Sequence, residues 1–257
     1  MVRGLYTSAI GMMTQMQKMD VVSNNIANSD TAGFKKDTAV VRSFSEELAK
    51  RLDDSKYKLI KFNQGIGNMS LGVFVDEVST DFSAGALQNS EGALDCAISG
   101  DGFFAISVTD KDGNTTEKYT RDGSFTLDSN NMLRTSEGNY VVGEGGNITI
   151  PNGNITIDDN GNIFSNNDFV DKLKIVDFSN KETLRKVGDN LYETIDESQT
   201  QNFTGSIIQG RLEASNVNSV EEMVKMISLA RNYEANQKMV QTHDSTLSRA
   251  VNDIAKK

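Results

Sequence analysis

Apolar residues recur at helical spacing near both ends of the chain. Close to the N-terminus they advance in alternating steps of four and three, in a line that runs Leu5, Ala9, Met12, Met16, Met19, Ser23 and Ile26. Tyr6, Ile10 and Met13 widen this line into an apolar face. Such spacing places the side chains on one side of an α-helix, as in the seam of a coiled coil. The pattern therefore predicts an N-terminal helix whose apolar face needs a partner.

The last forty-odd residues predict a second long helix over residues 212–257. Neither Gly nor Pro occurs between Leu212 and Ala255, and Asn216 or Asn218 can cap the start. With an interruption around Glu234, apolar residues recur in steps of three, four or seven at Val220, Met223, Ile227, Ala230, Val240, Leu247, Val251 and Ile254. We expect the two helices to pair with each other and with neighbouring chains. Two amphipathic helices on one globular core are the alternative.

Between these helices the period of the sequence changes to two. Turn dipeptides such as Asp122-Gly123 and Asn160-Gly161, which are typical of β-hairpins, separate short apolar runs, among them Val73–Val78, Phe103–Val108, Ser124–Leu127 and Leu173–Phe178. Gly146–Ile150 and Gly153–Ile157 both read Gly-Asn-Ile-Thr-Ile, which predicts two short strands around a tight turn. Residues 72–211 therefore predict an all-β domain.

The segment between the first helix and the β domain has two parts. A polar stretch from Asn24 to Asp30 should end the helix, Gly33 suits a positive φ, and Phe34 can act as an anchor. Residues 35–71 are interpreted as a linker with a short helix at Ser45–Leu52. The expected fold is α+β: residues 1–34 and 212–257 form paired coiled-coil helices, and the central all-β domain is inserted between them.

Charge is unevenly distributed along the chain, whose net charge is -10. Residues 1–36 hold four basic against two acidic residues, and residues 212–257 hold six of each, so the middle carries -12. This distribution excludes a broad basic face for nucleic acid and offers little attraction to anionic lipid. Nearly neutral ends suit close packing of like chains, whereas an acidic middle suits exposure to solvent.

Candidate chemical sites are few. Cys96 lies in an apolar run and is interpreted as a buried, inert thiol, and His243 as a solvated or inter-helix residue. Asp158–Gly161 fits a hairpin turn better than a calcium loop, and Gly100–Phe104 fits the entry to a strand better than a phosphate loop. We therefore predict no catalytic residues, no cofactor and no metal site. Neither a cleaved signal peptide nor direct membrane insertion is expected.

Motifs in three regions resemble those of the flagellar rod and hook family of bacteria, and together they cover essentially the whole chain. The N-terminal motifs are Leu5–Ala9, Ser23–Asn28 and Thr31–Lys35. The central ones are Gly100–Phe104 and Tyr119–Phe125, and the C-terminal ones are Leu212–Asn218, Glu221–Val224 and Tyr233-Glu234. Gly4–Tyr6 and Val141–Gly146 look more like proximal-rod proteins, whereas Tyr119–Phe125 and Leu212–Asn218 would fit distal-rod proteins equally well. The resemblance therefore favours a proximal-rod protein, with a distal-rod protein as the alternative.

The resemblance implies a protein without enzymatic activity that is exported unfolded by the flagellar type III apparatus. It would assemble helically with itself and with other rod and hook proteins, outside the cytoplasmic membrane, into the shaft that carries torque to the hook. The expected assembly residues lie on the two helices and on the turn after the first: Leu5, Met12, Met16, Met19, Ile26, Asn28, Gly33, Phe34, Val220, Met223, Ile227, Tyr233, Val240, Leu247 and Val251. A coiled-coil surface filament or adhesin, and a β-domain enzyme with helical ends, are the alternatives.

Overall fold

The chain folds into two compact units, each assembled from separate stretches of sequence. The computed structural model describes residues 2–44, 47–50, 65–70, 72–109, 113–151, 153–194 and 200–255. One unit comprises Met1–Ile26, Asp37–Ser79 and Ser219–Lys257, and the other Ala27–Lys36 and Thr80–Asn218. The first contains both long helices and the second is β-rich, which confirms the expected α+β class.

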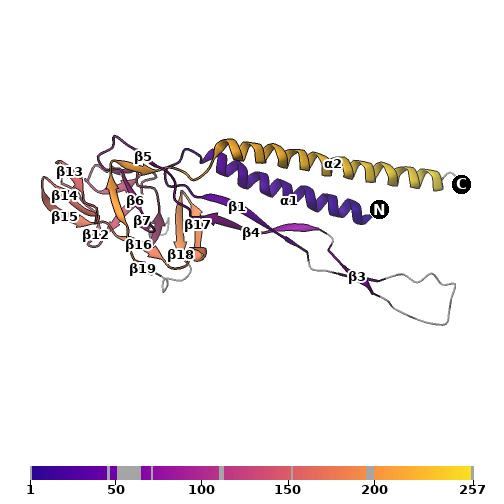
Figure 1. Cartoon of the computed structure of the whole chain (residues 1–257), viewed down its shortest axis with the longest axis horizontal. Helices are drawn as coiled ribbons and strands as arrows, with labels where there is room; N and C mark the ends of the chain where they lie inside the picture. Colours follow the sequence, from indigo (N-terminus) through magenta and orange to yellow (C-terminus); the bar gives the residue numbers. More distant parts are fainter. Residues whose placement is uncertain are drawn as a thin grey trace. The chain divides into compact units, whose positions relative to one another are not determined.

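Helices α1 (Val2–Ala27) and α2 (Ser219–Ala255) belong to the first unit. They run antiparallel, with the N- and C-termini at the same end of the pair (Figure 1). Among the described residues, neither helix has an apolar stretch long enough to cross a membrane. The start expected for the C-terminal helix is wrong, because Leu212 lies in strand β21 (Arg211–Glu213), which pairs with β5 (Leu87–Asn89). Sheet pairing there overrides a sequence that contains no helix breaker.

Strands occupy part of the segment that was expected to be a linker. β1 (Lys36–Ser43) pairs with β4 (Val73–Asp81), and β2 (Glu47–Lys50) pairs antiparallel with β3 (Gly65–Met69). The short helix expected at 45–52 is therefore wrong where the structure describes it, and its remaining residues lie outside the described ranges. Within the first unit, the hydroxyl of Thr14 donates to the carbonyl of Val73 over 2.7 Å and so joins α1 to β4.

The β-rich unit is built on a ten-stranded sheet with the order β17-β18-β8-β7-β11-β10-β9, to which β12, β16 and β19 are attached. β13, β14 and β15 form a three-stranded sheet, and β20 pairs with β6. The only helical turn described in this unit is the 3-10 helix Lys181–Thr183. The strands not yet bounded are β6 (Cys96–Ser99), β7 (Phe103–Thr109), β8 (Thr115–Thr120), β9 (Phe125–Leu127), β10 (Leu133–Thr135), β11 (Tyr140–Gly143), β12 (Gly146–Asn147), β13 (Ile155–Ile157), β14 (Asn162–Ser165), β15 (Asp168–Lys172), β16 (Ile175–Phe178), β17 (Leu184–Gly188), β18 (Leu191–Thr194), β19 (Thr200–Asn202) and β20 (Ser206–Gln209).

The repeated Gly-Asn-Ile-Thr-Ile segments do not pair with each other. β12 in the first repeat pairs with β11, and β13 in the second pairs with β14, so the expected two-strand arrangement is wrong. The turn at 158–161 is confirmed as a hairpin turn, because the amide of Gly161 donates to the carbonyl of Asp158 over 2.8 Å and Gly161 has a φ of +83°. Five-residue similarity is too local to determine which strands pair.

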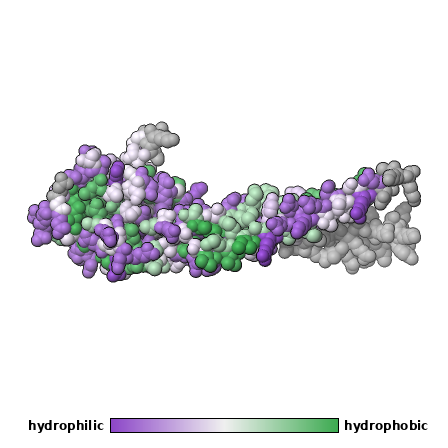
Figure 2. Space-filling view, turned by 90° about the horizontal axis from the view of Figure 1, so that it is seen from above, coloured by the Kyte–Doolittle hydropathy of each residue, from purple (hydrophilic) through white to green (hydrophobic). Residues whose placement is uncertain are grey.

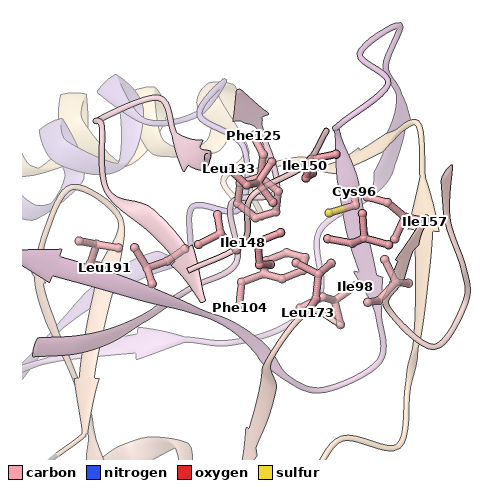
Figure 3. Close-up of a cluster of buried hydrophobic side chains, with 14 residues drawn as sticks. Cys96, Ile98, Phe104, Phe125, Leu133, Ile148, Ile150, Ile157, Leu173 and Leu191 are labelled. Carbon is pink, nitrogen blue, oxygen red and sulfur yellow. The ribbon is translucent and has the colours of Figure 1, made fainter. Parts of the chain in front are cut away.

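Two apolar clusters form the interior of the β-rich unit. The larger one gathers side chains from many strands, including Cys96, Phe104, Ile148 and Ile157 (Figure 3). The thiol of Cys96 is fully buried, as expected, and burial raises its pKa well above the usual range. The smaller cluster is aromatic: the ring of Phe103 lies 5.6 Å from Tyr192 and 5.8 Å from Phe178, between ring centroids. The polar residues described next belong to the same unit.

Candidate functional site

A buried ionic junction lies in the β-rich unit. The ammonium of Lys35 lies 2.6 Å from Oε1 of Glu213, and Nη1 of Arg121 lies 3.3 Å from Oε2 of the same carboxylate. These three side chains are 1, 4 and 2% exposed for Lys35, Arg121 and Glu213 respectively. Buried charges are tolerated only when they are paired and hydrogen-bonded. Here one carboxylate serves two cations.

Backbone groups complete the junction. The ammonium of Lys35 also donates to the carbonyl of Ser83 over 2.8 Å, and the amide of Gly85 donates to Oε1 of Glu213 over 2.8 Å. Nη2 of Arg121 donates to the carbonyl of Gly100 over 2.8 Å. Burial lowers the pKa of Lys35 below its usual value, although the hydrogen bond that its ammonium donates to Glu213 opposes this shift. The junction therefore connects chain segments far apart in the sequence.

The backbone of Gly33 contacts the backbone of two residues of the junction, Glu213 and Arg121. Its φ is +67°, as the sequence predicts, and its amide donates to the carbonyl of Glu213 over 2.7 Å. A Cβ atom at this position would lie 2.4 Å from the carbonyl carbon of Arg121, which is closer than real contacts allow. Only glycine satisfies both the left-handed conformation and this approach of two backbones.

The ring of Phe34 is 3% exposed, in agreement with its expected role as an anchor. The ammonium of Lys186 lies 3.7 Å from the ring centroid and donates to the carbonyl of Lys35 over 3.0 Å. This geometry combines a cation–π contact with a hydrogen bond to the next residue. In the preceding turn, Oδ1 of Asn28 accepts a hydrogen bond from the hydroxyl of Thr31 over 3.3 Å.

In the first unit, close contacts between α1 and α2 involve small and polar residues. A Cβ atom at Gly4 would lie 2.6 Å from Nε2 of His243, and one at Gly11 would lie 3.0 Å from Nδ2 of Asn236. His243 is therefore an inter-helix residue, as expected. Glycines at these two positions let polar side chains of α2 approach the backbone of α1.

The expected assembly residues on the helices divide into two groups. Leu5, Met12, Met19, Ile26, Tyr233, Val240 and Leu247 are half-buried. Met16, Val220, Met223, Ile227 and Val251 are exposed, with exposures of 52, 66, 47, 55 and 64%. Val224, which was not among the expected residues, adds to the exposed apolar surface where α2 begins (Figure 2). Large apolar side chains gathered on one surface mark a contact with other molecules.

Sequence reasoning missed the ionic residues of the site. Lys35, Arg121 and Glu213 all lie inside recognised motifs, but no role was assigned to them. The available signal was a charged residue in each of three motifs that are otherwise rich in small and polar residues. Among the described residues, no cluster of three or more His, Cys, Asp or Glu side chains is arranged to hold a metal ion.

Comparison with known proteins decides the family. Three family models match: "Flagella basal body rod protein" at residues 5–35, "Flagellar hook protein FlgE/F/G D1 domain" at 97–165 and "Flagellar basal body rod FlgEFG protein C-terminal" at 208–253. The flagellar basal-body rod protein FlgG of Buchnera aphidicola subsp. Schizaphis graminum is 35% identical, over 97% of this chain and 98% of the relative. The chain belongs to the flagellar basal-body rod protein family.

Two further rod proteins match at the same level. FlgG of Borreliella burgdorferi and FlgF of Caulobacter vibrioides are each 35% identical, and each match covers 98% of both chains. The ionic junction draws one charged residue from each matched region of this flagellar rod protein: Lys35 from the N-terminal region, Arg121 from the central one and Glu213 from the C-terminal one. The recognised motifs thus meet in space.

Proposed function

We propose that this rod structural subunit polymerises helically into the shaft that transmits torque from the flagellar motor to the hook. The observation that carries this proposal is the exposed apolar surface on α2, formed by Val220, Met223, Val224 and Ile227. A helix that displays such residues needs further helices to cover them. Copies of the same chain supply the required chemistry, because the ends of the chain are nearly neutral and do not repel one another.

In the assembled shaft, α1 and α2 would pair as a coiled coil and pack against the helices of neighbouring subunits. Half-buried residues recur along α2 in alternating steps of four and three, at positions that include Met226, Leu229, Tyr233, Asn236 and Val240. This spacing is the one that coiled-coil pairing requires. Other rod and hook proteins would be the neighbours at the two ends of the part of the shaft that this subunit forms.

We further propose export through the flagellar type III apparatus without a cleaved signal peptide, and a final position outside the cytoplasmic membrane. A position in the proximal part of the shaft, with the distal part as the alternative, stays a prediction from the motifs near Gly4 and Val141. The ionic junction would hold the chain segments of Lys35, Arg121 and Glu213 together within the β-rich unit of each subunit.

The test is complementation of a strain that lacks the gene, using a chain with an epitope inserted at Gly138. This glycine has open space around its Cβ position, so an insertion there should leave the fold intact. The expected result is restored swimming and antibody-labelled rods in purified basal bodies. Label at the proximal or the distal part of the rod decides the position. Swimming restored with label found only on the cell surface would overturn the proposal and favour a surface filament.

A further inference from the structure

The contacts between α1 and α2 share a single antiparallel register. Gly4 faces His243 and Gly11 faces Asn236, so a step of seven residues along α1 matches a step of seven back along α2. Two further such steps bring Asn25 to Glu222, and Nδ2 of Asn25 donates to Oε2 of Glu222 over 3.4 Å. The three contacts therefore lie on one line along the helix pair.

The glycine contacts alone do not select this register. If α2 slipped by one heptad, His243 would face Gly11, and that glycine would accommodate the imidazole as Gly4 does. Apolar residues in a heptad pattern likewise tolerate slippage by seven residues, since each meets a similar neighbour after the slip. To exclude the slipped register, one helix needs a buried polar residue whose hydrogen-bond partner lies at only one position of the other helix.

Asn25 has the geometry of such a residue. It is fully buried, and its amide group exchanges two hydrogen bonds with the backbone of Asp37: Nδ2 donates to the carbonyl over 2.8 Å, and Oδ1 accepts from the amide over 3.0 Å. These bonds fix the orientation of the side chain, so its remaining N–H group points towards α2. Glu222 is 1% exposed there, and its Oε1 accepts from Lys225 over 2.9 Å.

We propose that the Asn25–Glu222 contact is the lock that sets the register of the helix pair. A slip by one heptad would place Leu229 opposite Asn25. The buried N–H group of Asn25 would then face an apolar side chain in place of a carboxylate oxygen, which strongly disfavours the slipped state. The register decides which exposed apolar residues of α1 lie beside those of α2, and hence what surface the pair presents. The lock acts within a single chain, whether or not that chain assembles into a shaft.

The test measures the register by disulfide trapping in the full-length chain at high dilution. Gly11→Cys with Asn236→Cys reports the observed register, and Gly11→Cys with His243→Cys reports a slip by one heptad. Both pairs are made in the parent chain and in an Asn25→Leu/Glu222→Leu background, where the polar contact becomes apolar. The native Cys96 is fully buried in the other unit and does not compete. Products are identified by peptide mass spectrometry after mild oxidation.

In the parent chain we expect the 11–236 disulfide, and a yield of the 11–243 disulfide that is lower by at least about tenfold. Leaving a buried polar group unpaired shifts the equilibrium between the two registers by about that factor. In the double-leucine background both should form in comparable yield. If that background still gives only the 11–236 disulfide, or if the parent forms both equally, the lock is refuted. Should the double-leucine chain lose its helices by circular dichroism, Asn25→Ala takes its place with the same two outcomes. Glu222→Gln, which keeps the acceptor, should retain the single register.

Discussion

The ammonium of Lys35 and the carboxylate of Glu213 form an ion pair of 2.6 Å with almost no exposure to solvent. Lys35 directly precedes β1 in the sequence, and Glu213 ends the last strand before α2. Because Arg121 also contacts this carboxylate, the centre holds two cations and one anion. Removing the anion is therefore not equivalent to removing one of the cations.

Glu213→Ala is expected to destabilise the β-rich unit by about 3–5 kcal/mol, since it leaves two buried cations without their partner. Lys35→Met should cost clearly less, because Glu213 keeps Arg121 and the amide of Gly85. Urea unfolding of the full-length chain, followed by tyrosine fluorescence, measures both. Glu117→Ala is the control, since its ion pair with Lys174 lies at the surface and should contribute no more than about 1 kcal/mol. Equal losses for Glu213→Ala and Lys35→Met would contradict the asymmetry.

Gly33→Ala tests whether backbone approach, and not only conformation, requires glycine in the junction. The substitution meets both the positive φ and the backbone of Arg121. Gly138→Ala is the matched control, because Gly138 has a φ of +94° but nothing within 4 Å of its Cβ position. We expect about 1 kcal/mol of destabilisation for Gly138→Ala and a loss larger by about 1 kcal/mol or more for Gly33→Ala. The melting temperatures of the two variants are the measurement. Equal values would show that the backbone of Arg121 moves away from the added methyl group at no cost in stability.

How much the sequence predicts differs between the junction and the helices. The positive φ of Gly33 and the burial of Phe34 were predictable, because local residue type determines both. The role of Glu213 was not, because its partners Lys35 and Arg121 lie 178 and 92 residues away, and no local pattern encodes that pairing.

The helix pattern shows the same limit. Heptad spacing predicted two long helices, yet the close inter-helix contacts use Gly4 and Gly11, which a search for apolar residues passes over. The strands around Glu47 and Leu212 were missed for a related reason. Their residues are compatible with a helix, and only pairing with β3 and β5 makes them extended.

Asp122→Asn should reveal the cost of an ionised carboxylate inside the β-rich unit. Burial raises the pKa of Asp122, although the amide and hydroxyl of Ser124 donate to its Oδ1 over 2.9 and 2.8 Å and oppose the shift. A folded-state pKa above the unfolded value means that stability is lost as the pH rises through that interval. Asparagine retains the accepting oxygen and carries no charge. The variant should therefore melt at or above the parent temperature at pH 7.

That advantage should shrink as the pH falls from the folded-state pKa towards about 4, and it should be absent below about 4, where the parent carboxyl is protonated in both states. Differential scanning calorimetry of both chains between pH 3 and 7 is the measurement. Asp122→Ala, which also removes the acceptor of both hydrogen bonds, separates the effect of charge from that of hydrogen bonding. A variant less stable than the parent by a constant amount at every pH would show that the ionised form is not penalised.

Ile227→Asp addresses the exposed surface of α2, which the proposed assembly would bury. Its side chain is 55% exposed in the single chain, so the substitution should change the stability of the free subunit by no more than about 0.5 kcal/mol. In the shaft the same carboxylate would be buried between helices without a partner, at a cost of several kcal/mol per subunit. Because each subunit repeats the cost, we expect exported subunit, no rods in purified basal bodies and non-motile cells. Ser228→Asp, also exposed and one position further along the helix, adds the same charge about 100° around the helix axis and should have a weaker effect. Normal rods in the Ile227→Asp strain would show that neighbouring subunits leave this surface in contact with water, and the helix contacts of the shaft would have to be assigned to another face.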